Sequence, residues 1–331
     1  MTHGPLEISA NASMLQRASP PADNFVVGKE GEPHAIRRKQ ILKESPEVAE
    51  LYGSDWKQAV FCLFTVVLQV VGAYFAKDLS PIPFVIACYA FSGTLNHSLM
   101  LALHELSHDH FFEGHLPNLW FSFIANLPIG VAMASTFGRY HRLHHSAMGT
   151  SMVDMDLPTH WEAKFFSTAL GRLTWLFLQP FFYALRPMVL KPLPVTKWEI
   201  INWAMQLIFD GLIVYFWGYK AMLYFLLGTF LGTGIHPMSG HFFEHLETVI
   251  GQETYSYYGP LNFLCYNVGY HNEHHDFPRI AGSRLPQLKE KLPKWYDNLP
   301  HYTSWSNLIW NFVFRGNCNL YCRIVRTPKE A

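Results

Sequence analysis

Residues 58–76 read QAVFCLFTVVLQVVGAYFA and contain no charged side chain. A helix of about 20 apolar residues crosses the roughly 30 Å hydrocarbon layer of a membrane. Three further runs of this kind lie at 82–103, 200–217 and 221–240, and apart from histidines only Asp210 interrupts them with a charge. Such runs also fit buried helices of a large soluble core. Membrane spans are favoured because tryptophan and tyrosine lie at the ends of the runs, as at membrane interfaces: Trp56, Trp198, Trp217 and Tyr219.

The four runs form two tight pairs, since only residues 77–81 and 218–220 separate their members. Each pair is therefore predicted to be a hairpin that crosses the membrane and returns. If both linkers lie outside the cytosol, all but two of the 25 basic residues face the cytosol, in agreement with the positive-inside rule. This topology predicts that both chain ends are cytosolic.

Two other segments are expected to lie at the cytosolic surface as interfacial or re-entrant helices. Residues 116–138 are uncharged but broken by proline and asparagine, and residues 161–190 mix apolar and charged side chains. The polar start lacks a secretory signal. The expected organisation is a disordered tail at 1–32, a membrane domain at 33–320 and a C-terminal tail at 321–331. The predicted fold is all-α and polytopic, with a cytosolic, histidine-rich cap.

The composition excludes several other classes of protein. Of the 331 residues, 50% are hydrophobic and 15% charged, against about 25% charged in ordinary soluble domains. Lys+Arg and Asp+Glu both number 25, so the balance does not indicate nucleic-acid binding. The five cysteines are scattered, which argues against a disulfide framework.

Histidine, by contrast, is concentrated in three boxes that each follow an apolar segment. On a helix, positions i, i+3 and i+4 share a face, so each box presents two or three imidazoles together. Neutral imidazole is a good ligand for Zn, Cu, Fe or Ni. The predicted topology brings all three boxes to the cytosolic face as a metal centre. The boxes contain His104 and His108; His141, His144 and His145; and His271, His274 and His275.

The first box is also the zinc-protease motif, in which two histidines bind zinc and Glu105 activates water. A site of that kind uses one metal and three protein ligands, and it leaves the other two boxes without a role. Eight imidazoles suit two metals with about four nitrogens each. We therefore favour a two-metal centre and keep a membrane zinc protease as a remote alternative.

Further side chains are candidates for supporting roles. The ring nitrogen that faces away from a metal needs a carboxylate or carbonyl partner, and the nearby candidates are Glu105, Asp109, Asp154, Asp156, Glu273 and Asp276. His241 and His245, at the end of the last apolar run, are less certain additional ligands. His97 and His236 are expected to pack between helices or support ligands. The remaining histidines, including His34 and His110, are expected at the surface or in local hydrogen bonds.

With these boxes around two membrane hairpins, the chain resembles the integral-membrane fatty-acid desaturase and hydroxylase superfamily. Three stretches, HPMSGHF at 236–242, ETYSYYGPLN at 253–262 and NVGYHNEHHDFP at 267–278, resemble the sphingolipid delta-4 desaturases more closely. Shorter similarities lie at 33–38, 126–130 and 179–183, and the likeness runs from about residue 33 to about residue 314. The histidine boxes are shared by the whole superfamily, whereas the sequence of residues 253–278 is specific to the sphingolipid delta-4 desaturases.

This resemblance implies an enzyme of the endoplasmic reticulum membrane that desaturates dihydroceramide at the 4,5 bond, giving ceramide. The eight box histidines would hold two irons that activate O2. Electrons would come from NADH through a reductase and a separate cytochrome b5-type carrier, since the chain has no heme motif. Hydroxylation at C4, alone or with desaturation, stays open, because the outcome depends on sub-ångström placement. A catalytically dead lipid-binding relative is a further alternative, against which the complete boxes argue.

Two groups of residues have a possible role in binding. Aromatic side chains near the boxes can line a tunnel for the lipid chain, although packing is the commoner role of such residues: Tyr140, Tyr255, Tyr257, Tyr258, Tyr270 and Phe277. Basic side chains near the C-terminus can dock an acidic electron carrier or anionic lipid: Arg279, Arg284, Lys289, Lys291 and Lys294.

Overall fold

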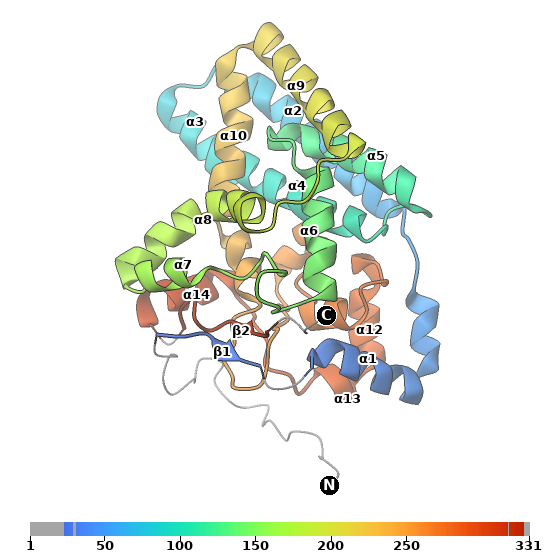
Figure 1. Cartoon of the computed structure of the whole chain (residues 1–331). Helices are drawn as coiled ribbons and strands as arrows, with labels where there is room; N and C mark the ends of the chain where they lie inside the picture. Colours follow the sequence, from blue (N-terminus) through green and yellow to red (C-terminus); the bar gives the residue numbers. More distant parts are fainter. Residues whose placement is uncertain (1–22, 29–30, 317, 328–331) are drawn as a thin grey trace.

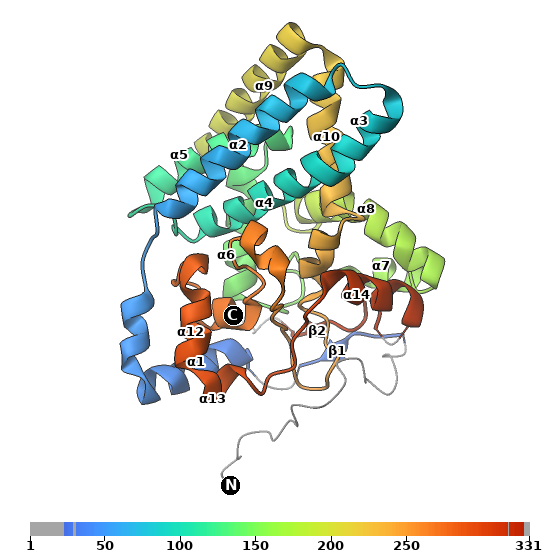
Figure 2. The ribbon, with the colours of Figure 1, turned by 180° about the vertical axis from the view of Figure 1, so that it is seen from behind.

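The computed structural model describes residues 23–28, 31–316 and 318–327 and is mostly helical. A bundle of apolar helices lies at one end of the molecule, and the first and last described segments, residues 23–28 and 318–327, lie toward the opposite end (Figure 1). Shorter helices and turns build that opposite end (Figure 2). The bundle contains α2 (Lys57–Ala76), α3 (Pro81–Ala87), η2 (Cys88–Gly93), α4 (Thr94–Ser107), α9 (Lys197–Trp217) and α10 (Tyr219–Thr233).

The remaining elements build the cap and its junction with the bundle. They are β1 (Val26–Val27), α1 (Pro33–Glu44), η1 (Pro46–Leu51), α5 (His115–Asn126), η3 (Leu127–Ile129), α6 (Ala134–Ser146), α7 (His160–Phe165), α8 (Ala169–Leu190), η4 (Pro237–Phe243), η5 (Pro260–Cys265), α11 (His271–Asp276), η6 (Gly282–Arg284), α12 (Leu285–Lys291), α13 (Pro293–Tyr296), α14 (Trp305–Trp310), η7 (Asn311–Arg315) and β2 (Ile324–Val325).

Among the described residues, three helices are long and apolar enough to cross a membrane: Lys57–Ala76, Pro81–Ser107 and Lys197–Trp217. Two bent pairs raise the number of candidate spans to five if each pair counts as one. The prediction of one continuous helix over 221–240 is wrong for residues 234–240. The helix α10 ends at Thr233, and the chain then bends by 49° into η4. Pro237 explains part of this break, since proline disfavours helical backbone in the residue before it.

The other bend lies within residues 116–138, the segment that was predicted to be broken. Here α5 and η3 meet α6 at an angle of 113°. Asn126 holds this bend together. Its Oδ1 accepts the backbone N–H groups of Met133 and Ala134 at 2.8 and 2.7 Å, and its Nδ2 donates to Val131 O and Gln206 Oε1. One asparagine therefore satisfies backbone groups that the turn removes from helical hydrogen bonding.

The described parts of the two expected tails contact each other. β1 and β2 form a two-stranded parallel sheet in which Val26 pairs with Ile324 and Val27 with Val325. This sheet is a small exception to the predicted all-α fold. It requires residues from both ends of the chain, which no local pattern indicates.

Close packing between α10 and η2 depends on glycine. A Cβ atom on Gly232 would lie 2.4 Å from the backbone oxygen of Gly93, whereas one on Gly211 in α9 would meet no atom within 4 Å. Small residues of this kind allow membrane helices to approach closely. We expect Gly232→Ala to lower the midpoint of thermal unfolding in detergent, because the clash is with backbone.

Gly211→Ala is the matched control, since it makes the same change in a membrane helix with open space around it. We expect its unfolding midpoint to equal that of the unsubstituted protein or to lie slightly above it. Equal midpoints for the two variants would contradict the proposed role of this contact.

Candidate metal centre

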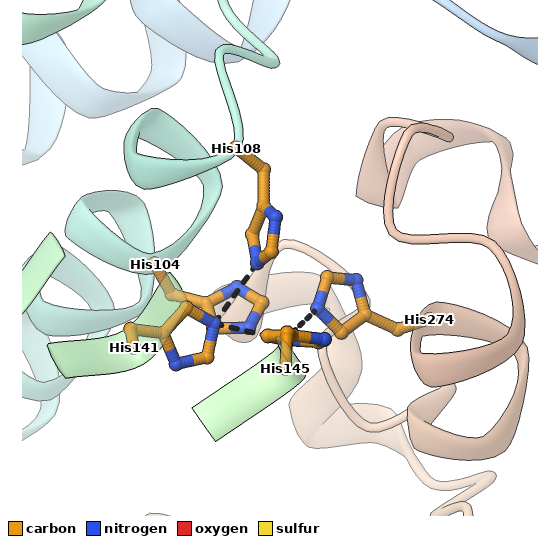
Figure 3. A group of neighbouring side chains, drawn as sticks. All are labelled: His104, His108, His141, His145 and His274. Atoms are coloured by element: carbon orange, nitrogen blue, oxygen red, sulfur yellow. Dashed lines mark hydrogen bonds between the residues drawn. The ribbon is translucent and has the colours of Figure 1, made fainter. Parts of the chain in front are cut away.

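Five histidines, three of them buried and two half-buried, form the first of two groups. One ring nitrogen from each lies within 4.8 Å of the others: His104, His108, His141, His145 and His274. Figure 3 shows these five rings gathered around one space, although they come from α4, its C-terminal end, α6 and α11. The Nε2 atoms of His108 and His141 are 2.9 Å apart, and those of His145 and His274 are 3.1 Å apart. Such convergence of nitrogen atoms provides a set of ligands suited to a metal ion.

The second group contains His144, His245, His271 and His275. The Nε2 atom of His245 lies 3.2 Å from that of His144 and 2.8 Å from that of His271. The Nε2 atom of His275 is buried and has no hydrogen-bond partner among the described residues. Since buried polar atoms are normally paired, this nitrogen fits a metal ligand.

Every box histidine therefore belongs to one of the two groups, which makes the set fit the expected pair of metals. His245 joins the second group. His241 belongs to neither, because its Nδ1 lies 3.1 Å from both His97 Nε2 and the Met238 carbonyl oxygen. That the histidines of the two groups bind metal stays a prediction.

Helix geometry explains how one box serves both groups. Adjacent residues on an α-helix point about 100° apart, whereas residues i and i+4 share a face. On α6, His141 and His145 therefore join the first group and His144 turns to the second. On α11, His274 joins the first group, while His271 and His275 join the second. The second and third boxes thus link the two groups, whereas both histidines of the first box belong to the first group.

Most imidazoles of the two groups are electrostatically suited to bind cations; the exception is His144, where burial lowers the pKa but Asp154 and Asp156 raise it overall. Burial, followed by neighbouring imidazoles, holds the pKa of His245, His271, His274 and His275 well below the usual value. These rings are consequently neutral near pH 7. Metal ligation requires this neutral form of histidine.

Three of the six predicted carboxylates face a box imidazole. Asp154 Oδ1 lies 3.0 Å from His144 Nδ1, and Asp156 approaches the same nitrogen at 3.5 Å. Glu105 Oε1 lies 3.2 Å from His104 Nδ1. These contacts can fix the rings with their Nε2 atoms directed into the groups.

The other three carboxylates hold different side chains. Asp109 pairs with exposed His115. Glu273 accepts hydrogen bonds from the hydroxyls of Ser256 and Tyr258, and Asp276 binds side chains of α1. Glu244, which was not predicted, also faces a box imidazole, because its Oε2 lies 3.5 Å from His271 Nδ1. Glu244 is fully buried, which raises its pKa, and it accepts a hydrogen bond from Trp305 Nε1. Its only signal in the sequence was its position beside His245.

The third box is also held by α1, at the other end of the chain. Asp276 accepts from His34 Nδ1 at 2.7 Å, Arg37 Nε at 2.6 Å and the Tyr296 hydroxyl at 3.0 Å. Burial raises the pKa of Asp276, but the charges and hydrogen bonds of Arg37 and His34 together outweigh it, and the net pKa is lowered. The ring of His34 lies 5.0 Å from that of His275. The expectation of a surface or local role for His34 is wrong, since it is buried and bonded to distant residues.

An apolar cavity of about 590 Å³ lies beside the first group and reaches His141. Its lining comes mainly from α6, α8 and α10. Of the six aromatic residues suggested for a tunnel, only Tyr140 lines it. Others pack elsewhere; Tyr257, for example, stacks on Trp305 at 3.9 Å between ring centroids.

Comparison with known proteins shows the family to which this chain belongs. The family model described as "Fatty acid desaturase" matches residues 79–306, and "Sphingolipid Delta4-desaturase (DES)" matches residues 21–57. The chain is 46% identical to "Sphingolipid delta(4)-desaturase DES1" of Drosophila melanogaster, over 90% of this chain and 94% of the relative. It is 45% identical to the Homo sapiens protein of that name, over 90% and 93%. It is 44% identical to "Sphingolipid delta(4)-desaturase DES1-like" of Oryza sativa subsp. japonica, over 93% and 95%. The chain belongs to the fatty acid desaturase family, among its sphingolipid delta(4)-desaturases.

Proposed function

We propose that this protein introduces the 4,5 double bond into dihydroceramide and so produces ceramide. The observation that carries the proposal is the pair of buried histidine groups at the end of an apolar cavity. The relatives named sphingolipid delta(4)-desaturases match 90% of the chain and support this choice of lipid.

In this proposal each histidine group holds one iron. The bound irons supply, with O2, the oxidising power needed to break unactivated C–H bonds. The protein contributes the ligands, the hydrogen bonds that orient them, and a cavity that keeps the alkyl chain from water. Asp154 and Glu105 act on the ring orientation of His144 and His104. Holding one methylene pair beside the centre supplies the orientation that selective reaction requires.

The location and electron supply follow from the same proposal. We place the protein in the endoplasmic reticulum membrane, with both histidine groups and both chain ends in the cytosol. A reduced cytochrome b5-type protein, with its NADH-dependent reductase, is the proposed donor. Of the basic residues considered for docking it, Arg284 is already occupied by the backbone oxygens of Leu51, Tyr52 and Ser54. Lys289 pairs with Asp297 and Lys294 with Glu44, both in ion pairs. Exposed Lys291 is therefore the better candidate.

C4-hydroxylation remains the second candidate, since it would use the same histidines and cavity. The zinc-protease alternative is weaker, because both Glu105 oxygens already have partners. Oε1 faces His104, while Oε2 accepts from Gly282 N at 2.7 Å and faces His110 at 2.9 Å. Such a carboxylate is not available to activate water.

Two measurements test the proposal. Expression in cells that lack delta-4 desaturase activity is expected to yield long-chain bases with a 4,5 double bond, detected by mass spectrometry. The purified protein is expected to contain about two Fe per chain, as the two ligand groups require. A hydroxyl at C4 instead of the double bond would favour the second candidate. One Zn with little Fe would contradict both.

A further inference from the structure

The position of the proposed reaction limits where the substrate's polar groups can lie. In dihydroceramide the C4–C5 bond adjoins C3, which carries a hydroxyl, and C2, which carries the amide. When C4 and C5 are beside the histidine groups, these polar groups must lie close to the same place. An entirely apolar cavity would leave them without hydrogen bonds, which is costly. A sphingoid substrate therefore requires polar protein groups at the inner end of the cavity.

The structure has such groups where the apolar cavity meets a smaller pocket of about 80 Å³ lined by histidines of both groups. Apart from His141, the polar residues that line both spaces are Asp156, Gln179 and Tyr183. Gln179 is 3% exposed, and its Oε1 has no hydrogen-bond partner in the described part of the chain. Burial, followed by the charge of Asp156, raises the pKa of the Tyr183 hydroxyl, so the two side chains interact.

Of these three residues, Gln179 is the one with a buried side-chain atom that has no hydrogen-bond partner among the described residues. Nearby Arg186 also lines the histidine pocket, but its guanidinium is bound by both oxygens of Glu162 and by the Met155 carbonyl. Buried polar side chains usually find partners. A carboxamide can both donate and accept, and thus complements a hydroxyl or an amide.

Other lining residues of the cavity suit a hydrocarbon chain. Phe181 and Met188 of α8 are about half exposed, as is Val131 near the bend between α5 and α6. Exposed apolar side chains of this kind can contact lipid. The cavity thus combines apolar, partly exposed lining residues with the polar residues that it shares with the histidine pocket.

We propose that Gln179, together with the Tyr183–Asp156 pair, binds the C3 hydroxyl and the C2 amide of the sphingoid base. This site sets the distance from the polar groups to His141 and so selects C4 and C5 for reaction. The inference rests on the proposed function and adds to it the residues that distinguish a sphingoid base from a plain acyl chain. Asp156 also lies 3.5 Å from His144 Nδ1, which links this site to the second histidine group.

The test compares two substrates on matched variants. The purified enzyme, supplied with its reductase and electron carrier, is assayed with dihydroceramide and with its 3-deoxy analogue. We expect the unsubstituted protein to prefer dihydroceramide in kcat/KM by about 10-fold or more, the effect of one buried hydrogen bond. In Gln179→Leu this preference is expected to fall close to one, mainly through loss of activity on dihydroceramide. Tyr183→Phe is expected to reduce the preference as well.

Gln58→Leu is the control, because it makes the same change at a buried glutamine that does not line the cavity. We expect it to retain the full preference. Iron content near that of the unsubstituted protein shows that a variant is folded. Should Gln179→Leu not accumulate, Tyr183→Phe carries the test alone. An unchanged preference in folded Gln179→Leu or Tyr183→Phe would overturn the inference, whereas an unsubstituted protein that forms no double bond would overturn the proposed function instead.

Discussion

Replacement of His245 by alanine is expected to abolish formation of the double bond, lowering product by more than about 100-fold, since even residues that only support metal ligands cost 10–100-fold. The imidazole lies between His144 and His271 in the second histidine group, with Nε2 separations of 3.2 and 2.8 Å. Its loss would leave that group with three imidazoles. We expect iron to fall from about two to about one per chain, measured by elemental analysis of purified protein.

His241→Ala is the matched control, because His241 lies four residues before His245 in the chain but belongs to neither histidine group. Its Nδ1 faces His97 and the Met238 carbonyl. We expect this variant to keep both irons. Near-normal product from His245→Ala, or equal loss of iron from both variants, would refute the assignment of His245 to the centre.

Substitution of Asp276 by alanine is the second change with a large expected effect. The carboxylate is fully buried and pairs with Arg37 and His34 of α1. Removing one partner of a buried ion pair costs about 3–5 kcal/mol, because the remaining charge stays unpaired. Since Asp276 directly follows His274 and His275, we expect loss of iron together with a lower free energy of unfolding.

Arg37→Ala tests the same contact from the other side and is expected to lower product by about 10–100-fold. Lys39→Ala is its control, since Lys39 is exposed on the same helix. Loss of iron in Arg37→Ala but not in Lys39→Ala would support a role for α1 in positioning the third box. If iron content and product were normal in Arg37→Ala, the contact between α1 and α11 would have no part in the centre.

The local patterns predicted much of the fold. Apolar runs gave the positions of α2, of the helix Pro81–Ser107 and of α9, because length and hydropathy are properties of a single segment. The break after Thr233 was missed, although Gly234 and Pro237 signal it, since hydropathy does not distinguish a straight helix from a bent one.

The histidine site was predictable in its members but not in its arrangement. Spacing within each box identified eight histidines, and the structure brings all eight together. How they divide into two groups depends on the relative rotation of α4, α6 and α11, which packing decides. Glu244 and His34 were missed for a related reason, because their contacts join residues 27 and 242 positions apart and a local motif cannot indicate them.

The contact between α1 and Asp276 has a consequence for biogenesis. Residues 33–44 leave the ribosome before α2 and the later apolar helices, but Asp276, which they contact, is made only after the last of these helices. The third box therefore cannot be fully supported until all of these helices have been made. Stable loading of the proposed irons would then follow their synthesis, so a nascent chain that stops before residue 271 would carry the early histidines as an open, unloaded site.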